Sequence, residues 1–197
     1  MKKKPTIPEI FSALSEDEYL KSLIKKRIIK IILGSSVIRA LPAGTKPILT
    51  LRLETIPVLE LCAIDSQISF NAWHKRQVSK VEKCLKGCIN DSTRLKEDEV
   101  FGHAAKIFNL YLSHLVLYSA FFSQDEVMRI KYFLHVPLDS KVFSAIKVDK
   151  SLDIPNSIKS LKPKSYNSIQ DTIRKCAAQF KLPAIYFDEF AWTLEDD

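Results

Sequence analysis

The stretch from His103 to Phe122, HAAKIFNLYLSHLVLYSAFF, is apolar on nearly every side when it is wound as a helix. A helix with this pattern has to be buried in the middle of a bundle. At about 100° per residue, its polar members fall within one arc of roughly 140°. They are His103, Lys106, Asn109, Ser113 and His114. The stretch therefore predicts a buried central helix that carries a polar stripe.

Helical patterns recur on both sides of this stretch. Ser15 and Glu18 have the spacing of a capping box, which predicts a helix from there to about Leu33. Apolar periodicity predicts further helices over 65–85, 97–122, 124–134, 140–146, 168–180 and 188–195. We therefore expect a mainly α, single-domain helical bundle that spans residues 1–197.

Two segments depart from the helical pattern. Leucines alternate with polar residues from Leu49 to Leu53, which predicts one short strand near 48–54. Residues 149–165 hold two prolines and many Lys and Ser residues, and we expect them to form an exposed linker.

The composition excludes several classes of protein. The 197 residues include only 4 glycines, and no G-x-G-x-x-G or GK[ST] motif occurs, so a Rossmann or P-loop nucleotide site is excluded. Cys84 and Cys88 could share one helix face, but no second pair completes a tetrahedral metal site. We expect buried free thiols and no metal or cofactor.

The apolar stretches also bear on location. Residues 5–18 contain no apolar block of a secretory signal, and Leu110 to Phe122 is too short and too polar to span a membrane. We expect no membrane span and a cytoplasmic address.

Charge is unevenly distributed along this chain of formal charge +7. Residues 73–96 hold seven Lys and Arg against two acids, and residues 129–181 hold eleven against four. Residues 188–197 hold five acids and no base. A basic body with an acidic segment suits a polyanion such as DNA, although a solvated lysine-rich surface is the plainer alternative.

Lys106 and Asp139 are the candidate reactive residues. A lysine in the first turns of a buried helix must snorkel out, pair with an acid or face a cleft. The positive end of the helix dipole favours its neutral, nucleophilic amine. Asp139 follows Pro137 and can open the next helix, either as an N-cap alone or as a carboxylate held in a site as well.

These two residues stand in strings that resemble a known family. Gly102-His-Ala-Ala-Lys106-Ile-Phe-Asn and Val136-Pro-Leu-Asp139-Ser-Lys-Val142 are similar to the lysine helix and the aspartate turn of helix-hairpin-helix DNA glycosylases. The wide gap between them looks most like the archaeal 8-oxoguanine branch. The resemblance covers residues 98–147. The glycine-rich hairpin, which holds a DNA phosphate in that family, is reduced here to Gly102.

The resemblance implies a DNA glycosylase and AP lyase that excises an 8-oxoguanine-like base. Lys106 would form a Schiff base with the sugar, and Asp139 would accept a proton or stabilise the positive charge on the sugar. We expect base and backbone contacts from the following residues: Trp73, His74, Lys75, Arg76, His103 and Asn109. For Trp73, a place in the core of a helix with an outward basic face is the alternative. The same two interpretations, an aromatic face for a base or a core tryptophan, apply to Trp192.

Two other functions stay open. One is a non-catalytic, nucleic-acid-binding helical protein, and the other is an all-α module that assembles with a protein partner. Salt-dependent DNA binding is expected of the glycosylase and of the binding protein, but not of the module.

Overall fold

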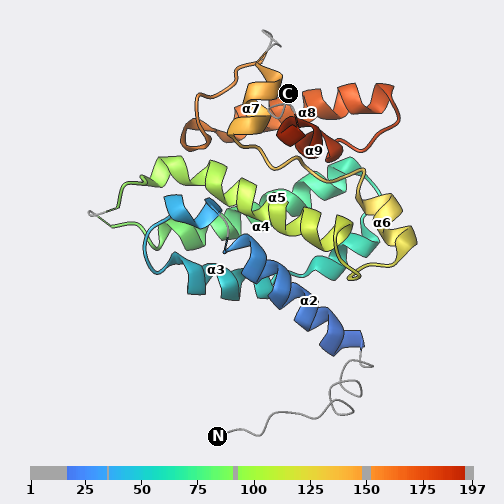
Figure 1. The fold of residues 1–197 in the computed structure, drawn as a ribbon, viewed down its shortest axis with the longest axis horizontal. Coiled ribbons are helices and arrows are strands. Elements are labelled where there is room, and N and C mark those ends of the chain that lie inside the picture. Colours follow the sequence, from blue (N-terminus) through green and yellow to red (C-terminus); the bar gives the residue numbers. More distant parts are fainter. Residues whose placement is uncertain (1–16, 35, 91–92, 148–151, 194–197) are drawn as a thin grey trace, which may run out of the picture.

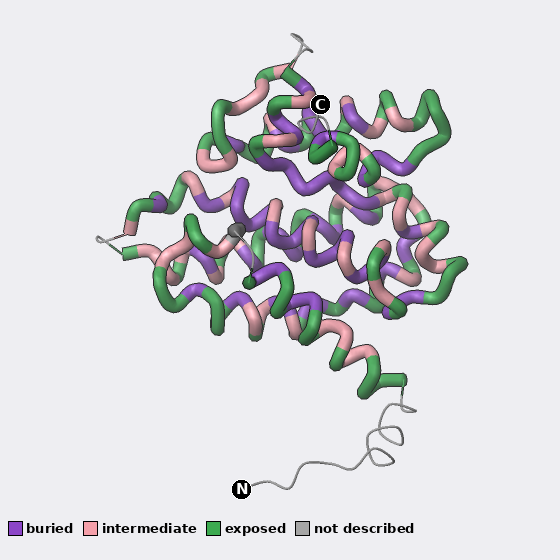
Figure 2. Tube along the Cα trace, in the orientation of Figure 1, coloured by how far each residue is buried: buried purple, intermediate pink, exposed green. Residues whose placement is uncertain are grey.

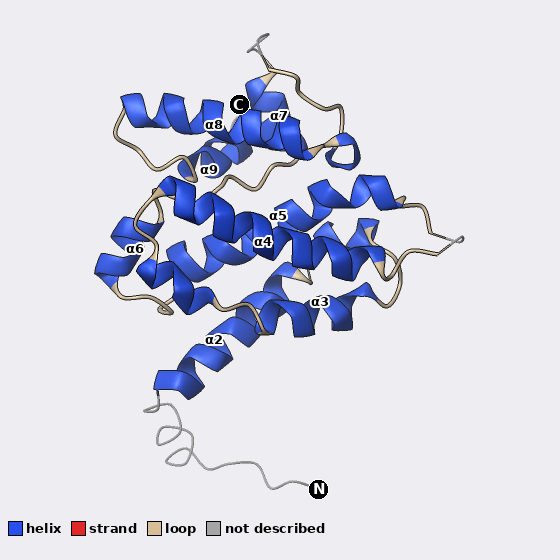
Figure 3. Ribbon diagram, turned by 180° about the vertical axis from the view of Figure 1, so that it is seen from behind, coloured by secondary structure: helices blue, strands red, loops and turns tan. Residues whose placement is uncertain are grey.

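A computed structural model describes residues 17–34, 36–90, 93–147 and 152–193. Helices and loops make up this part of the chain, and no strand occurs in it, so the mainly α prediction is confirmed (Figure 3). Ser15, which was expected to cap the first helix, and residues 194–195, which were expected to end the last one, lie outside the described residues.

The helices are arranged in three tiers (Figure 1). The central tier holds α4 (Gln67–Lys86) and α5 (Val100–Leu117), which pack against each other. Below them lie α2 (Asp17–Ile32) and α3 (Thr45–Glu54), and α6 (Gln124–Ile130) lies at one side. Above them lie α7 (Ser140–Ile146), α8 (Pro163–Gln179) and α9 (Tyr186–Thr193).

Short 3-10 helices connect these elements. They are η1 (Ser36–Ala40), η2 (Val58–Ala63), η3 (Glu97–Glu99) and η4 (Ile158–Ser160). Two of these short helices, η3 and η4, lie against the beginning of α5.

The core is continuous through the tiers, and α5 is its most buried helix (Figure 2). Ile107, Phe108 and Tyr111 are fully enclosed, as their apolar surroundings in the sequence predict. The helix is shorter than the expected 97–122, because residues 97–99 form η3 and the α-helix ends at Leu117. Within the described residues, no helix is both long enough and apolar enough to cross a membrane.

The strand expected near 48–54 is wrong, because these residues belong to α3. Leu49 and Leu53 are one helical turn apart and both are 0% exposed, whereas Leu51 between them is 65% exposed. That distribution is helical, since a strand would place all three on one face. Pro47 is compatible with this helix, because it lies in the first turn, where a proline is tolerated.

The prediction of an exposed linker over 149–165 is wrong for part of the described residues of this segment. Leu161 is 1% exposed, and a Cβ added to Gly102 would meet the Ile158 carbonyl oxygen at 2.0 Å. The segment therefore packs closely on the start of α5, and α8 begins at Pro163, earlier than the expected 168.

Candidate active site

Lys106 and Asp139 meet, although 33 residues separate them in the sequence. The Lys106 Nζ atom donates to Asp139 Oδ2 at 3.1 Å. The Lys106 side chain is 18% exposed and that of Asp139 is 7% exposed. The pair therefore lies at the edge of the core, where α5 passes the start of α7, and is partly open to solvent.

Asp139 is held rigidly because it also caps α7. Its Oδ1 atom accepts hydrogen bonds from the backbone N–H groups of Lys141 at 3.0 Å and Val142 at 3.1 Å. Each carboxylate oxygen thus has a separate partner, one in the helix cap and one on Lys106. Both interpretations of Asp139, as an N-cap and as a carboxylate held in a site, fit this geometry.

Helix α9 brings a second carboxyl group, Asp188, to this place. Burial raises the pKa of Asp188 to about 7, and the negative charges of Asp139 and Glu189 act in the same direction, while the Lys106 ammonium opposes them. Near neutral pH, Asp188 can therefore hold or release a proton beside the pair.

An exposed indole lies on the same side of α9. Trp192, one turn after Asp188, is 53% exposed, and the Lys141 ammonium lies 5.7 Å from the centroid of its ring. Asp188 was not among the residues predicted from the sequence, whereas Trp192 was open to the same two interpretations as Trp73. Their spacing of four residues on a helix was the available signal, because it places an acid and an aromatic ring on one face.

A cleft of about 350 Å³ runs between α5 and α9. Ser113 and His114 of the polar stripe line it from α5, and Asp188 and Glu189 line it from α9. Leu110, one turn after Lys106, also contributes to its wall. The volume falls at the lower end of the range typical of small-ligand sites.

His74 and Asn109, which were expected to contact DNA, lie instead in a buried polar network. The His74 Nε2 atom lies 2.6 Å from Asn109 Oδ1, and the Asn109 amide donates to the Tyr166 hydroxyl at 2.9 Å. His135 reaches the same hydroxyl through Nδ1 at 2.8 Å. Both His74 and Asn109 are almost fully buried, so neither is presented to a base.

Burial keeps the histidines of this network neutral. It lowers the pKa of His74 to about 4 and that of His135 well below its usual value. The network joins α4, α5 and α8 to the segment that precedes Asp139. We therefore interpret it as the support of the site, rather than as its reacting part.

The remaining candidates lie apart from the pair or are enclosed. Trp73 is 2% exposed and its Nε1 donates to Glu60 Oε2 at 2.8 Å, so it is the core tryptophan of the alternative interpretation. Lys75 and Arg76 are exposed on α4, where Lys75 lines a different cleft, between α4 and α8. The structure does not bring these residues to Lys106.

His103 lies one turn before Lys106 and is 4% exposed. Its pKa is lowered to about 4 by burial, and the positive charges of Lys159 and Lys106 act in the same direction. Its Nε2 atom is buried and has no hydrogen-bond partner within the part of the chain that the structure describes. His103 is therefore a neutral group at the edge of the site.

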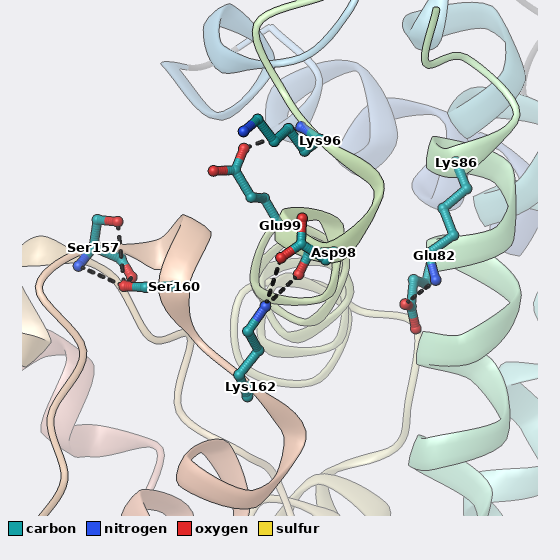
Figure 4. Close-up of polar contacts among 8 residues, drawn as sticks. All are labelled: Glu82, Lys86, Lys96, Asp98, Glu99, Ser157, Ser160 and Lys162. Atoms are coloured by element: carbon teal, nitrogen blue, oxygen red, sulfur yellow. Dashed lines mark hydrogen bonds and ion pairs between the residues drawn. The ribbon is translucent and has the colours of Figure 1, made fainter.

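The start of α5 is fixed by ionic and backbone contacts (Figure 4). The Lys162 ammonium, which lies just before α8, contacts the Asp98 carboxylate at 3.1 Å and the Asp98 carbonyl at 2.8 Å. The Glu99 carboxylate accepts from the Lys96 backbone N–H at 3.0 Å. These contacts hold α8 and η3 together beside the helix that carries Lys106.

Within the described residues, neither a metal-binding cluster nor a known relative defines the site. In the described residues, no group of three or more His, Cys, Asp and Glu side chains is placed to hold a metal ion. No family model, curated protein or solved structure matches the chain. What the site can do must therefore be argued from its own geometry.

Proposed function

We propose that the protein is a DNA glycosylase and AP lyase, with Lys106 as its nucleophile and Asp139 as its proton acceptor. The observation that carries the proposal is the 3.1 Å contact between Lys106 Nζ and Asp139 Oδ2 at a partly open edge of the core. The resemblance of the two strings to helix-hairpin-helix glycosylases supports the same pairing, and 8-oxoguanine is the first lesion to test.

The chemistry follows from the two groups. Asp139 accepts a proton from the Lys106 ammonium, and the neutral amine attacks C1′ of the sugar. As the nitrogen–carbon bond forms, the glycosidic bond breaks, and its electron pair leaves with the base, which takes up a proton. The sugar ring then opens to give the Schiff base. Loss of a C2′ proton expels the 3′ phosphate and nicks the strand.

The cleft between α5 and α9 is the proposed place for the base. A base has to leave the helical stack before an enzyme can reach its glycosidic bond. Trp192 of α9 presents an exposed ring next to the Lys141 ammonium, two residues after Asp139, and such rings stack on bases of any sequence. Trp192 thus takes the role for which Trp73 was considered, and Asp188, one turn before it on α9, lines the cleft.

An all-α interaction module is the second candidate. A largely apolar cleft of about 570 Å³ lies between α7, α8 and α9, and exposed Phe180 and Phe190 line it. Exposed apolar surface of this kind is typical of protein contact sites. This candidate predicts no covalent chemistry at Lys106.

Borohydride trapping distinguishes the two candidates. The full chain would be incubated with labelled duplexes that carry 8-oxoguanine, uracil or an abasic site, and then treated with borohydride. We expect a covalent band that Lys106→Gln and Lys106→Arg abolish. The arginine variant keeps a positive charge next to Asp139 but cannot form a stable Schiff base.

Lys147→Gln is the matched control, because Lys147 is exposed at the far end of α7. Its band should equal that of the wild type. Absence of a band on every duplex, with DNA still retained in a salt-dependent manner, would leave a non-catalytic binding protein. Absence of both would favour the interaction module.

A further inference from the structure

The segment from Leu134 to Asp139 carries the acid of the reacting pair and is buried without being helical. The N–H and C=O groups of a buried, extended backbone need hydrogen-bond partners. A neighbouring strand does not supply them, because the described residues include none. Side chains from the flanking helices therefore have to take its place.

Gln170 of α8 supplies both partners for Val136. Its Oε1 atom accepts from the Val136 N–H at 2.9 Å, and its Nε2 atom donates to the Val136 carbonyl at 2.7 Å. This double contact imitates the pairing that an adjacent strand makes. Asn109 of α5 adds a second donor to the same carbonyl at 3.1 Å. Gln170 is only 2% exposed, so bulk water does not compete for these bonds.

The chain between Val136 and Asp139 has little freedom. Pro137 fixes its own φ angle and restricts Val136 to an extended conformation. Leu138 is 1% exposed and packs into the core, and Asp139 then enters α7 as its N-cap. A shift of the Val136 backbone is therefore passed on to the Asp139 carboxylate.

We propose that Gln170 is a positioning residue of the Lys106–Asp139 pair. By holding the backbone of Val136, it sets the distance between the Asp139 carboxylate and the Lys106 amine. The catalytic consequence rests on the proposed function, whereas the placement of the two groups does not require DNA. The two parts can therefore be tested separately.

The first test measures how reactive the Lys106 amine is in the folded, full-length chain. Reductive methylation of each lysine would be followed by mass spectrometry in the wild type, Gln170→Leu and Asp139→Asn. Loss of the ion pair frees Lys106, so we expect roughly two- to fivefold faster labelling of Lys106 in both variants.

Gln77→Leu is the matched control. Gln77 is also a glutamine that is 2% exposed, and its Oε1 atom accepts from Arg52 Nη2 at 2.9 Å, away from the pair. This variant loses a buried amide contact without touching Val136, so its Lys106 labelling should equal that of the wild type. Labelling that stays at the wild-type rate in Gln170→Leu, or rises equally in Gln77→Leu, would overturn the positioning role.

The second test measures single-turnover trapping on abasic DNA. A displacement of about 1 Å can cost roughly 100-fold in rate, so Gln170→Leu should trap about 10- to 100-fold more slowly, with unchanged DNA affinity. Gln77→Leu should trap at the wild-type rate. Equal losses of rate and affinity in Gln170→Leu would contradict the proposal.

Gln170→Met covers the case in which the leucine variant does not fold, because its unbranched side chain can fill the space of the glutamine. It removes both contacts to Val136, so faster labelling of Lys106 and slower trapping are expected, and wild-type values would refute the role. Absence of trapping in the wild type would refute the proposed function, while the labelling result would still decide the role of Gln170.

Discussion

The two carboxylate oxygens of Asp139 have different hydrogen-bond partners. Oδ1 closes the first turn of α7, while Oδ2 faces the Lys106 amine at 3.1 Å. A carboxylate used in this way cannot rotate without losing its helix cap. The cap therefore lowers the conformational freedom of the carboxylate that pairs with Lys106, which is the form of preorganisation that the proposed role of Asp139 needs.

The two roles of Asp139 can be separated by mutation. Asparagine caps helices as well as aspartate does, whereas alanine costs about 1 kcal/mol at an N-cap. We therefore expect the free energy of unfolding of Asp139→Ala, measured by urea denaturation, to be about 1 kcal/mol lower than that of Asp139→Asn. Both variants should lose borohydride trapping. Equal stability of the two would show that the cap contributes nothing.

At the residue scale, the sequence predicts the Lys106–Asp139 pair better than its surroundings. Lys106 and Asp139 could be singled out because each breaks an apolar or helical pattern. Trp73 could not be assigned, since a core indole and a base-stacking indole look alike among basic neighbours. The spacing of Asp188 and Trp192 places them on one helix face, but only the tertiary path of α9 brings Asp188 close to Lys106 and Trp192 close to Lys141.

Helix α3 shows how short periodicity can mislead. Three alternating leucines fit a strand, but the same residues fit a helix that buries Leu49 and Leu53 and exposes Leu51. The pattern is too short to distinguish period 2 from period 3.6. The packing of α3 against α2 and α4 decides between them, and this contact is absent from the local sequence.

Truncation of two leucines in α3 tests that assignment. Leu53→Ala should lower the free energy of unfolding by about 2–5 kcal/mol, because the side chain is 0% exposed. Leu51→Ala should change it by less than about 0.5 kcal/mol, since that side chain is 65% exposed. Similar losses in urea denaturation would instead place both side chains on one buried face, as in a strand.

The contact between α5 and η4 depends on Gly102. An added Cβ would meet the Ile158 carbonyl oxygen at 2.0 Å, so the two backbones would have to separate. We expect Gly102→Ala to cost about 1–3 kcal/mol of stability in urea denaturation.

Gly87→Ala provides the control for this contact, because a Cβ there meets backbone atoms only at 3.6 Å or more, and φ is −64°. It should be neutral or should stabilise the chain by up to about 1 kcal/mol. A Gly102→Ala variant as stable as Gly87→Ala would show that η4 does not hold α5 tightly.

At the scale of the whole molecule, the site is assembled where the upper tier meets the central one. Lys106 comes from α5, Asp139 from the start of α7, and Asp188 from α9. The buried polar network contains His74 and His135, and both stay neutral because they are buried. The stability of this junction therefore depends on proton binding, and so on pH.

The histidines and Asp188 respond to pH in opposite directions. Between pH 6.5 and about 4, the unfolded chain binds protons at His74 and His103 while the folded chain does not, so acid lowers stability. The pKa of Asp188 is raised from 3.8 to about 7, so between these two pH values the folded chain holds a proton that the unfolded chain has released. Acid therefore raises stability through Asp188 between pH 7 and pH 3.8. With His135 shifted in the same direction as the other histidines, the histidines outweigh Asp188.

We therefore expect the free energy of unfolding to fall between pH 7 and pH 5, by on the order of 1 kcal/mol for each buried histidine. Asp188→Asn removes the opposing group, so its stability should fall more steeply over this interval. Its advantage over the wild type should grow as pH rises towards 7 and stay constant above that. Urea denaturation of both chains from pH 4.5 to 8 measures these differences. Parallel curves would mean that Asp188 titrates with an ordinary pKa and is not enclosed beside Lys106 and Asp139.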